Sequence, residues 1–330
     1  MSPIKRVWNR LTNRLTGHLT GHLHRKALWS ILFAIALSIT FLFQACGTSA
    51  PDTANSNADA PALSQSGEQQ SDGNIDTLAQ EHSGDKPTAT PAAMAEPTVP
   101  VTGESVTYAT VEGQPITGYL AQPTDKVGEA LPALITIHEW WGLNENIEAM
   151  TRRLAGEGYT VLAIDLYGGQ IATDPTEAGE LVRSVMDNPG SAQDNLFQAA
   201  EFLKSEYNAP ALGSIGWCFG GNWSLRTGLL LSSDLDAIAI YYGQLILAPE
   251  ALDALDMPII GFFGEDDSSI AVEDVNNFES TLTDLGKTVD INLYPGVGHA
   301  FANPSGQNYN AAAAEDAWTK TVAFFNTHLQ

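Results

Sequence analysis

The run Gly-Trp-Cys-Phe-Gly-Gly at residues 216–221 constrains the fold of this 330-residue chain more than any other stretch. An apolar, strand-like segment precedes it and a helix-like segment follows, so Cys218 lies at a strand-to-helix turn. A side chain at Gly216 or Gly220 would crowd a backbone that bends this sharply. The turn lifts the cysteine out of the sheet and directs a helix N-terminus at its sulfur, which favours the thiolate. Taken alone, the pattern fits a reactive nucleophile and a buried structural cysteine equally well.

Residues 1–46 read as a basic region followed by a hydrophobic segment. Every charged residue before Cys46 is Lys or Arg, and residues 27–45 are almost entirely apolar. This order predicts an export signal or a membrane anchor, and the apolar length is close to the ~20 residues that span a bilayer. Residues 43–46 also resemble, imperfectly, a bacterial lipobox with Cys46 as the lipidated residue. An uncleaved anchor and a lipidated Cys46 both stay open, and a fully released protein is the third alternative. All three place the rest of the chain outside the cytoplasm, and the first two place it on the outer face of a bacterial membrane or in the periplasm.

Residues 47–100 are rich in Ala, Ser, Thr, Pro, Asp, Gln and Asn and contain few large apolar side chains. Such a segment buries too little apolar surface to offset the entropy of ordering its backbone. We therefore expect a flexible, low-complexity linker between the N-terminal segment and a globular domain at 101–330.

The charge balance limits the possible partners. Nine of the 15 basic residues follow Cys46, against all 39 acidic residues, so the exported part carries a formal charge of −30. This argues against binding to nucleic acid or to an anionic membrane surface, and leaves membrane contact to the N-terminal segment only.

The two cysteines are Cys46 and Cys218. If Cys46 is lipidated or embedded, Cys218 is an unpaired thiol in an oxidising compartment, and catalysis would give it a reason to be there.

From residue 101 onward, strand patterns alternate with helix patterns. Residues 105–111 and 116–122 alternate around a Gly-Gln-Pro turn and predict an antiparallel hairpin. The chain then predicts strands at 132–137, 159–165, 211–217, 235–241, 257–263 and 288–294, and helices at 144–157, 175–186, 192–207, 222–231, 272–285 and 310–329. This is an α/β pattern, with a mostly parallel sheet covered by helices on both faces.

Chemically capable residues follow three of these strands. Cys218 follows 211–217, an acidic loop at 264–270 follows 257–263, and His299 follows 288–294. Side chains at the carboxyl ends of parallel strands converge, and nucleophile, acid, histidine is the chain order of the α/β-hydrolase triad. The histidine would take the thiol proton and the acid would fix the imidazole tautomer. Asp267 is the preferred acid for its place in the loop, and Asp266 stays an alternative.

The His138-Glu139-Trp140 loop follows the strand at 132–137 and should lie beside the turn at Cys218. In this architecture the backbone N–H groups of Trp140 and Phe219 would form the oxyanion hole. Glu139 beside a thiol would share one proton with it, although an ordinary ion pair at the rim is also possible. His138-Glu139 lacks the second histidine of a His-Glu-x-x-His zinc motif, so no metal is expected.

Four motifs in register carry a family resemblance: residues 216–221, 138–144, Asp-Leu-Tyr-Gly at 165–168, and Gly-His-Ala-Phe at 298–301. Together they resemble the dienelactone hydrolase family over about residues 106–329. The resemblance implies a single α/β-hydrolase domain with Cys218, His299 and Asp267 as its triad. It implies that Glu139 holds the resting thiol and accepts its proton when substrate binds. It also implies hydrolysis of a lactone such as carboxymethylenebutenolide without metal or cofactor.

The chain departs from the family at the position of a substrate-binding arginine. Leu181 stands at roughly that place, and Arg183 lies two residues further along, which on a helix points its side chain elsewhere. Arg183 and Trp141 are the candidate substrate-binding residues. The favoured partner is a small lactone or ester. A general carboxylesterase or thioesterase, and a non-catalytic exported binding module, are the alternatives.

Overall fold

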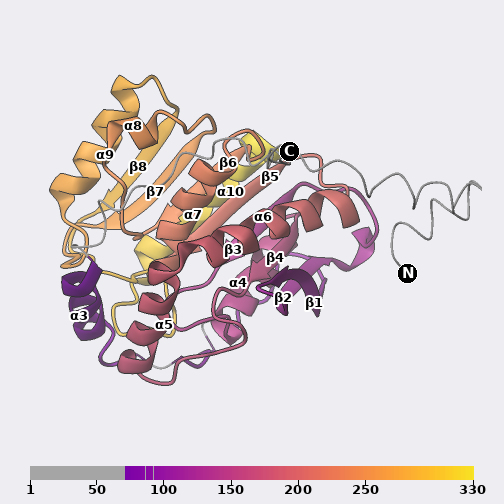
Figure 1. Cartoon of the computed structure of the whole chain (residues 1–330), viewed down its shortest axis with the longest axis horizontal. Helices are drawn as coiled ribbons and strands as arrows, with labels where there is room; N and C mark the ends of the chain where they lie inside the picture. Colours follow the sequence, from indigo (N-terminus) through magenta and orange to yellow (C-terminus); the bar gives the residue numbers. More distant parts are fainter. Residues whose placement is uncertain (1–70, 86, 92) are drawn as a thin grey trace, which may run out of the picture. The chain divides into compact units, whose positions relative to one another are not determined.

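The computed structural model describes residues 71–85, 87–91 and 93–330, and Figure 1 shows their arrangement. In this part of the chain one eight-stranded sheet has the order β1-β2-β4-β3-β5-β6-β7-β8. The strands are β1 (Val101–Val111), β2 (Gln114–Pro123), β3 (Ala133–Ile137), β4 (Thr160–Ile164), β5 (Leu212–Trp217), β6 (Ala237–Tyr241), β7 (Ile259–Gly264) and β8 (Val289–Tyr294).

The first two strands form the predicted hairpin, and β2 also pairs antiparallel with β4. From β4 across to β8 every neighbouring pair is parallel. The five strands from β3 to β7 are buried along their whole length, as expected of a parallel sheet covered on both faces. The predicted fold class is therefore confirmed.

Helices alternate with the strands. They are α3 (Ser71–Glu81), α4 (Glu145–Gly156), α5 (Pro175–Asp187), α6 (Pro189–Glu206), α7 (Phe219–Leu230), α8 (Pro249–Leu252), α9 (Val272–Asp284) and α10 (Ala311–Leu329), with a short 3-10 turn at Thr124–Lys126. The predicted helices at 144–157 through 310–329 are all present, while α3 and α8 were not predicted. The helix after Cys218 begins at Phe219, three residues earlier than the pattern indicated.

Hydrogen bonds between strand side chains and helix side chains show which face of the sheet each helix covers. Ser214 on β5 bonds Ser224 of α7, whereas Thr136 on β3 bonds Thr151 of α4. Tyr241 on β6 bonds Thr321 of α10. Ser214 pairs with Ile135 of β3, so these two side chains point to the same face of the sheet. Thr136 is the next residue along β3 and points to the other face, so α7 and α4 cover different faces. Arg153 of α4 pairs with Glu315 of α10, which places these two helices on one face.

Part of the predicted flexible linker is ordered. Residues 71–81 form α3, and Glu81, Asp85 and Thr98 make hydrogen bonds to the domain at 101–330. The linker was predicted because residues 47–100 contain few large apolar side chains that could be buried. The contacts described here are instead made by polar side chains, such as those of Glu81 and Asp85, which bond loops of the domain. A flexible linker at 47–100 stays a prediction, and α3 together with these hydrogen bonds is what the structure describes within it.

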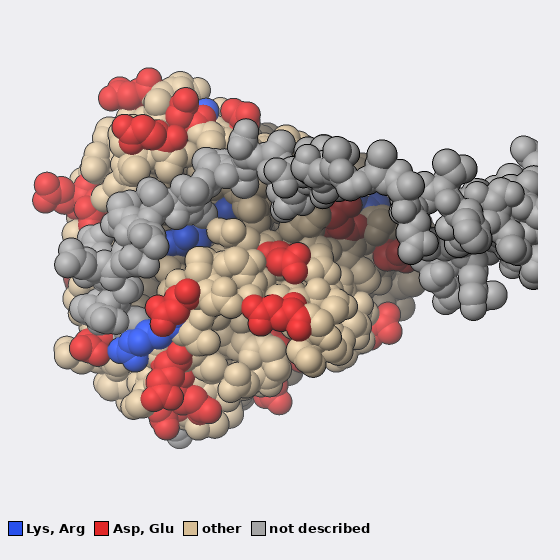
Figure 2. Space-filling model, viewed as in Figure 1, with Lys and Arg blue, Asp and Glu red and all other residues tan. Residues whose placement is uncertain are grey.

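The predicted signal or anchor at 1–46, with Cys46, lies outside the described residues. Within the described ranges, no helix combines the length and the apolar character needed to cross a membrane. Figure 2 shows acidic side chains scattered over the visible face with few basic ones among them, in keeping with the acidic composition.

Candidate active site

Cys218 lies at a strained turn between β5 and α7. Its backbone has φ 55° and ψ −119°, in a region that residues with a side chain rarely adopt. A Cβ added to Gly216 would lie 2.0 Å from the carbonyl oxygen of Gly220, and one added to Gly220 would lie 2.2 Å from that of Ile137. The glycines are therefore required, as the sequence predicted. They allow the turn to pack directly on the carboxyl end of β3, beside the His138-Glu139-Trp140 loop.

The candidate acid Asp267 and the candidate base His299 lie in contact. His299 Nδ1 lies 2.8 Å from Asp267 Oδ2, and both residues are buried. The other Asp267 oxygen accepts hydrogen bonds from the backbone N–H groups of Ser269 and Ile270 at 2.8 and 3.0 Å. Asp266, the alternative acid, is exposed. The arrangement fixes the imidazole with Nδ1 on the acid and leaves Nε2 for the thiol.

The surroundings of Cys218 favour its thiolate. Burial raises the pKa of the thiol, but the imidazoles of His299 and His82 more than offset this, and the pKa falls to about 6. Burial lowers the pKa of His299, but the charges of Asp267 and Cys218 raise it well above its ordinary value. Both shifts favour a thiolate at Cys218 beside a protonated His299.

Glu139 lies close enough to Cys218 for their charges to interact. Burial, and then the Cys218 charge, raise the pKa of Glu139 to about 8, so at neutral pH the carboxyl keeps its proton. Its Oε2 accepts a 2.7 Å hydrogen bond from Asn303 Nδ2, while its Oε1 has no hydrogen-bond partner. Glu139 thus does not hydrogen-bond the resting thiol. The nearby Cys218 charge instead favours the protonated, neutral form of Glu139.

The predicted oxyanion donors lie at suitable places in the backbone. Phe219 is the first residue of α7, so its N–H is among those without a partner inside the helix. Trp140 belongs to the loop that the turn packs against. His138 holds this loop: its ring bonds the Glu139 carbonyl at 2.6 Å through Nδ1 and accepts from the Leu166 N–H at 3.1 Å through Nε2. Both ring nitrogens are thereby used, which makes His138 a structural residue.

A second imidazole, which the sequence did not predict, lies at the thiol. His82 is 1% exposed, and its ring centre is 5.4 Å from that of His299 and 4.8 Å from that of Trp140. Its Nδ1 lies 2.6 Å from Asp85 Oδ2. Burial lowers the pKa of His82, but Asp85 and then Cys218 raise it to about 9. His82 is therefore a buried cation that stabilises the Cys218 thiolate.

Described residues between 81 and 98 make hydrogen bonds to the loops that follow Asp267 and His299. Glu81 accepts hydrogen bonds from the Ser268 N–H at 2.9 Å and the Ser269 hydroxyl at 2.7 Å, next to Asp267. Asp85 accepts from the Gln307 N–H at 2.7 Å. Thr90 donates its N–H to the Ser305 hydroxyl at 2.9 Å. We call residues 81–85, 87–91 and 93–98 the cover segment. Its His82 lies at the site, where Cys218 is only 2% exposed.

The two candidate substrate-binding residues have different surroundings. Trp141 is buried, and its ring centre lies 6.2 Å from that of His82, so it lines the covered site. Arg183, on α5, has its guanidinium 3.9 Å from Asp76 of α3 and is 41% exposed. Arg183 is thus directed towards α3. Its recognition of a substrate carboxylate stays a prediction.

Other residues of the site had no distinctive signal in the sequence. Asn303 is a single amide in the loop after His299, and Tyr242 follows β6 with a positive φ of 36° and its ring centre 5.2 Å from that of His299. The position of Tyr242 after a strand was the only available indication. His82 lies in a polar segment, and nothing in the surrounding sequence distinguishes it from a solvent-exposed histidine.

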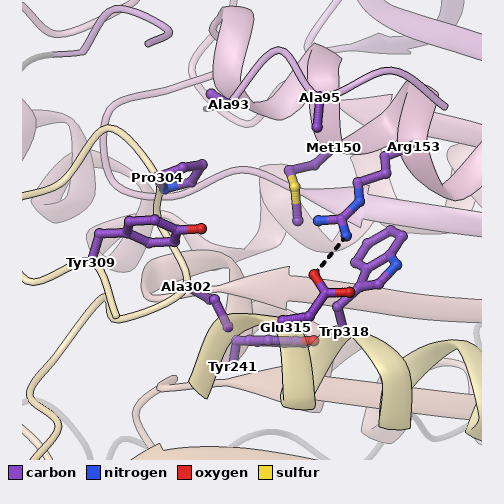
Figure 3. A pocket seen from close by; sticks show the side chains of 11 residues that line it. Ala93, Ala95, Met150, Arg153, Tyr241, Ala302, Pro304, Tyr309, Glu315 and Trp318 are labelled. Atoms are coloured by element: carbon purple, nitrogen blue, oxygen red, sulfur yellow. Dashed lines mark hydrogen bonds and ion pairs between the residues drawn. The ribbon is translucent and has the colours of Figure 1, made fainter. Parts of the chain in front are cut away.

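A small cavity of about 40 Å³ lies elsewhere in the domain, between the cover segment, α4 and α10. Figure 3 shows the side chains that line it. Arg153 pairs with Glu315 across it and stacks 3.9 Å over the Trp318 ring. None of the triad residues lines this cavity, and its volume is far below that of an ordinary ligand site. It is a packing gap beneath the cover segment.

Comparison with known proteins agrees with this geometry. The sequence profile of the Dienelactone hydrolase family matches residues 116–329. Protein usf of Aquifex pyrophilus is 34% identical over 224 residues, which cover 66% of this chain and 95% of that protein. A "putative carboxymethylenebutenolidase" of Synechocystis is 34% identical over 235 residues, covering 65% of this chain and 93% of that protein.

A solved structure gives the same fold. The dienelactone hydrolase of Anabaena variabilis superposes with a TM-score of 0.54 at 19% identity, covering 70% of this chain and 99% of that one. This likeness supports the α/β-hydrolase architecture, while the sequence matches support the enzyme class. The chain belongs to the dienelactone hydrolase family and is a hydrolase of lactone or carboxylic ester bonds.

Proposed function

We propose that the chain hydrolyses its substrate through a Cys218 thioester, with His299 as acid and base and Asp267 as the residue that orients His299. The observation that carries this is the 2.8 Å bond between His299 Nδ1 and Asp267, made beside a cysteine on a nucleophile turn. No cofactor is required, because the thiolate, the proton shuttle and the oxyanion donors are all groups of this chain.

Each step balances with these groups. The Cys218 thiolate attacks the carbonyl carbon, and the N–H groups of Trp140 and Phe219 stabilise the resulting oxyanion. When the tetrahedral intermediate collapses, the alkoxide leaves with the proton of the His299 imidazolium, and a thioester remains. His299, now neutral, takes a proton from water as that water attacks the thioester. The carboxylic acid departs and the thiolate–imidazolium pair is restored.

The side chains around the thiol favour an uncharged ester or lactone over one that carries a carboxylate. The groups near Cys218 include the acids Glu139, Asp267 and Glu81 together with aromatic rings. A substrate carboxylate would gain from His82 and His299 but would be repelled by Asp267 and Glu81, whereas Glu139 is neutral. The candidate Arg183 is directed towards α3. A general carboxylesterase or thioesterase is therefore the second candidate function.

Replacement of the nucleophile tests the proposal. Cys218→Ala should lower kcat for p-nitrophenyl acetate by at least about 10³-fold, while Cys46→Ser should leave it unchanged. Unchanged turnover by Cys218→Ala would overturn the assignment. A panel of neutral esters, acyl thioesters and carboxylate-bearing lactones then separates the two candidate functions by kcat/KM.

We also propose that the N-terminal segment exports the enzyme and anchors it outside the cytoplasm. Its support is the order of basic residues, an apolar run at 27–45 and Cys46. Mass spectrometry of the mature N-terminus separates an uncleaved anchor from a lipidated Cys46. Recovery of the enzyme in the soluble cytoplasmic fraction, with an unmodified N-terminus, would contradict both.

A further inference from the structure

The covered site contains one imidazole more than acyl transfer requires. A cysteine hydrolase needs one histidine to move protons, and His299 meets that need with Asp267 as its partner. His82 is a second buried imidazole at the same thiol, supplied by a different segment and equipped with its own carboxylate, Asp85.

The two histidines are held in the same way. Each has its Nδ1 on a carboxylate, at 2.6 Å for His82 and 2.8 Å for His299. Each has a buried Nε2 that makes no other hydrogen bond of ordinary geometry. Carboxylates on the far nitrogen are the usual outer partners of metal-binding histidines, because they fix the tautomer and make Nε2 more basic.

The three potential ligand atoms are close together. Single ligand atoms of His82, Cys218 and His299 all lie within 4.8 Å of one another, and all three residues are buried. In a tetrahedral zinc site, with Zn–N near 2.0 Å and Zn–S near 2.3 Å, ligand atoms are about 3.3 to 3.8 Å apart. Small side-chain rotations would bring the cluster to this spacing. Thiolate and imidazole are the ligands that Zn²⁺ prefers among protein groups.

We propose that His82, Cys218 and His299 form a binding site for Zn²⁺ or a similar borderline-soft divalent cation, which silences the enzyme while it is bound. On binding, the ion would displace the Nε2 protons of both imidazolium rings into solvent. It would then take the thiolate electron pair and the two Nε2 electron pairs, which leaves neither a nucleophile nor a base. The fourth coordination position would be filled by solvent. Bonding His82 to the same ion would also fasten the cover segment over the site. The silencing rests on the proposed function, whereas the binding does not.

Co²⁺ is the probe for binding, because a thiolate bound to cobalt gives a charge-transfer absorption band in the near ultraviolet. We expect the full-length protein to show this band at one equivalent of Co²⁺ and to lose it on addition of Zn²⁺. Cys218→Ala should abolish the band. Cys46→Ser should keep it, which excludes the other thiol, and His328→Ala should leave the Co²⁺ affinity unchanged as a control for surface histidines.

Two variants test the cover segment. His82→Ala should weaken Co²⁺ binding by at least about 100-fold, and Asp85→Asn by about 10–100-fold, the range for outer partners of metal ligands. Asp85→Asn keeps the size of the side chain, so it serves if His82→Ala is misfolded by circular dichroism. Absence of the band in the wild type, or an unchanged affinity in Asp85→Asn, overturns the metal site.

Activity separates this inference from the proposed function. Zn²⁺ should inhibit ester hydrolysis by the full-length protein, a chelator should restore it, and Asp85→Asn should need correspondingly more Zn²⁺. If the Co²⁺ band forms but no ester is hydrolysed, the metal site stands and the proposed function falls. If esters are hydrolysed through Cys218 but no band forms, the function stands and the metal site falls.

Discussion

Asp267 holds His299 through a 2.8 Å bond to Nδ1, although the neighbouring Asp266 is exposed. Asp267→Asn should therefore lower kcat by roughly 10²–10⁴-fold, because an amide presents a donor to Nδ1 and favours the wrong imidazole tautomer. Asp266→Asn is the matched control and should stay within about twofold of the wild type. Steady-state hydrolysis of p-nitrophenyl acetate measures both. Equal effects of the two variants would show that Asp267 does not orient the base.

The thiol of Cys218 should titrate far below an ordinary cysteine. Its pKa of about 6 means that the rate of alkylation by iodoacetamide rises through that pH and then levels off, whereas a free cysteine titrates near ~8.5. Cys46→Ser provides the background in which only Cys218 reacts. In that background His82→Ala should move the midpoint upward, since it removes a cation that stabilises the thiolate. A midpoint near 8.5 before the His82 change would contradict the thiolate–imidazolium pair.

Glu81 should control access to the site. Its carboxylate bonds Ser268 and Ser269, and hydrogen bonds to a charged group are worth ~1.5–3 kcal/mol each. Glu81→Ala should therefore raise the population with an open cover segment by about 10-fold or more, and raise the labelling rate of Cys218 by a bulky maleimide to match. Asp76→Ala, on the exposed side of α3, is the control and should have little effect. Unchanged labelling in Glu81→Ala would show that the cover segment does not limit access.

The glycines at the turn should be intolerant of any side chain. Gly220→Ala places a Cβ 2.2 Å from a backbone oxygen of β3, which cannot withdraw without moving the strand, so we expect a loss of ~3 kcal/mol or more in the free energy of unfolding. Gly190→Ala, in α6 with its nearest atom 4.0 Å away, is the control and should be neutral or stabilising by up to ~1 kcal/mol. Urea denaturation measures both. A stable Gly220→Ala protein would refute the close packing.

The sequence predicted the parts of this enzyme that depend on regular patterns. Strand and helix periodicity located the sheet, and the glycines at 216 and 220 located the turn, because each reflects a local steric or burial requirement. His299 and Asp267 could be found from their places after strands, since parallel strands bring their carboxyl ends together. Which of the adjacent acids faces His299 depends on how the loop turns, and that follows from backbone hydrogen bonds to Asp267 that leave no compositional trace.

His82 could not be found in this way. It reaches Cys218 across more than a hundred residues of chain, and the bonds that bring it there are single polar contacts without a period. Composition measures how much apolar surface a segment can bury, but the cover segment is held by Glu81, Asp85 and Thr90. Asn303 was missed for a similar reason, because its role lies in one hydrogen bond to Glu139.

His82 and its partner Asp85 lie upstream of the family match, which begins at residue 116. The catalytic residues and the residues proposed to inhibit them through a bound metal therefore lie in separate, consecutive stretches of the chain. A change confined to the upstream stretch could release, tighten or replace this inhibition while the hydrolase domain kept its catalytic groups. Relatives that share the domain but differ upstream would attack the same bonds under different control.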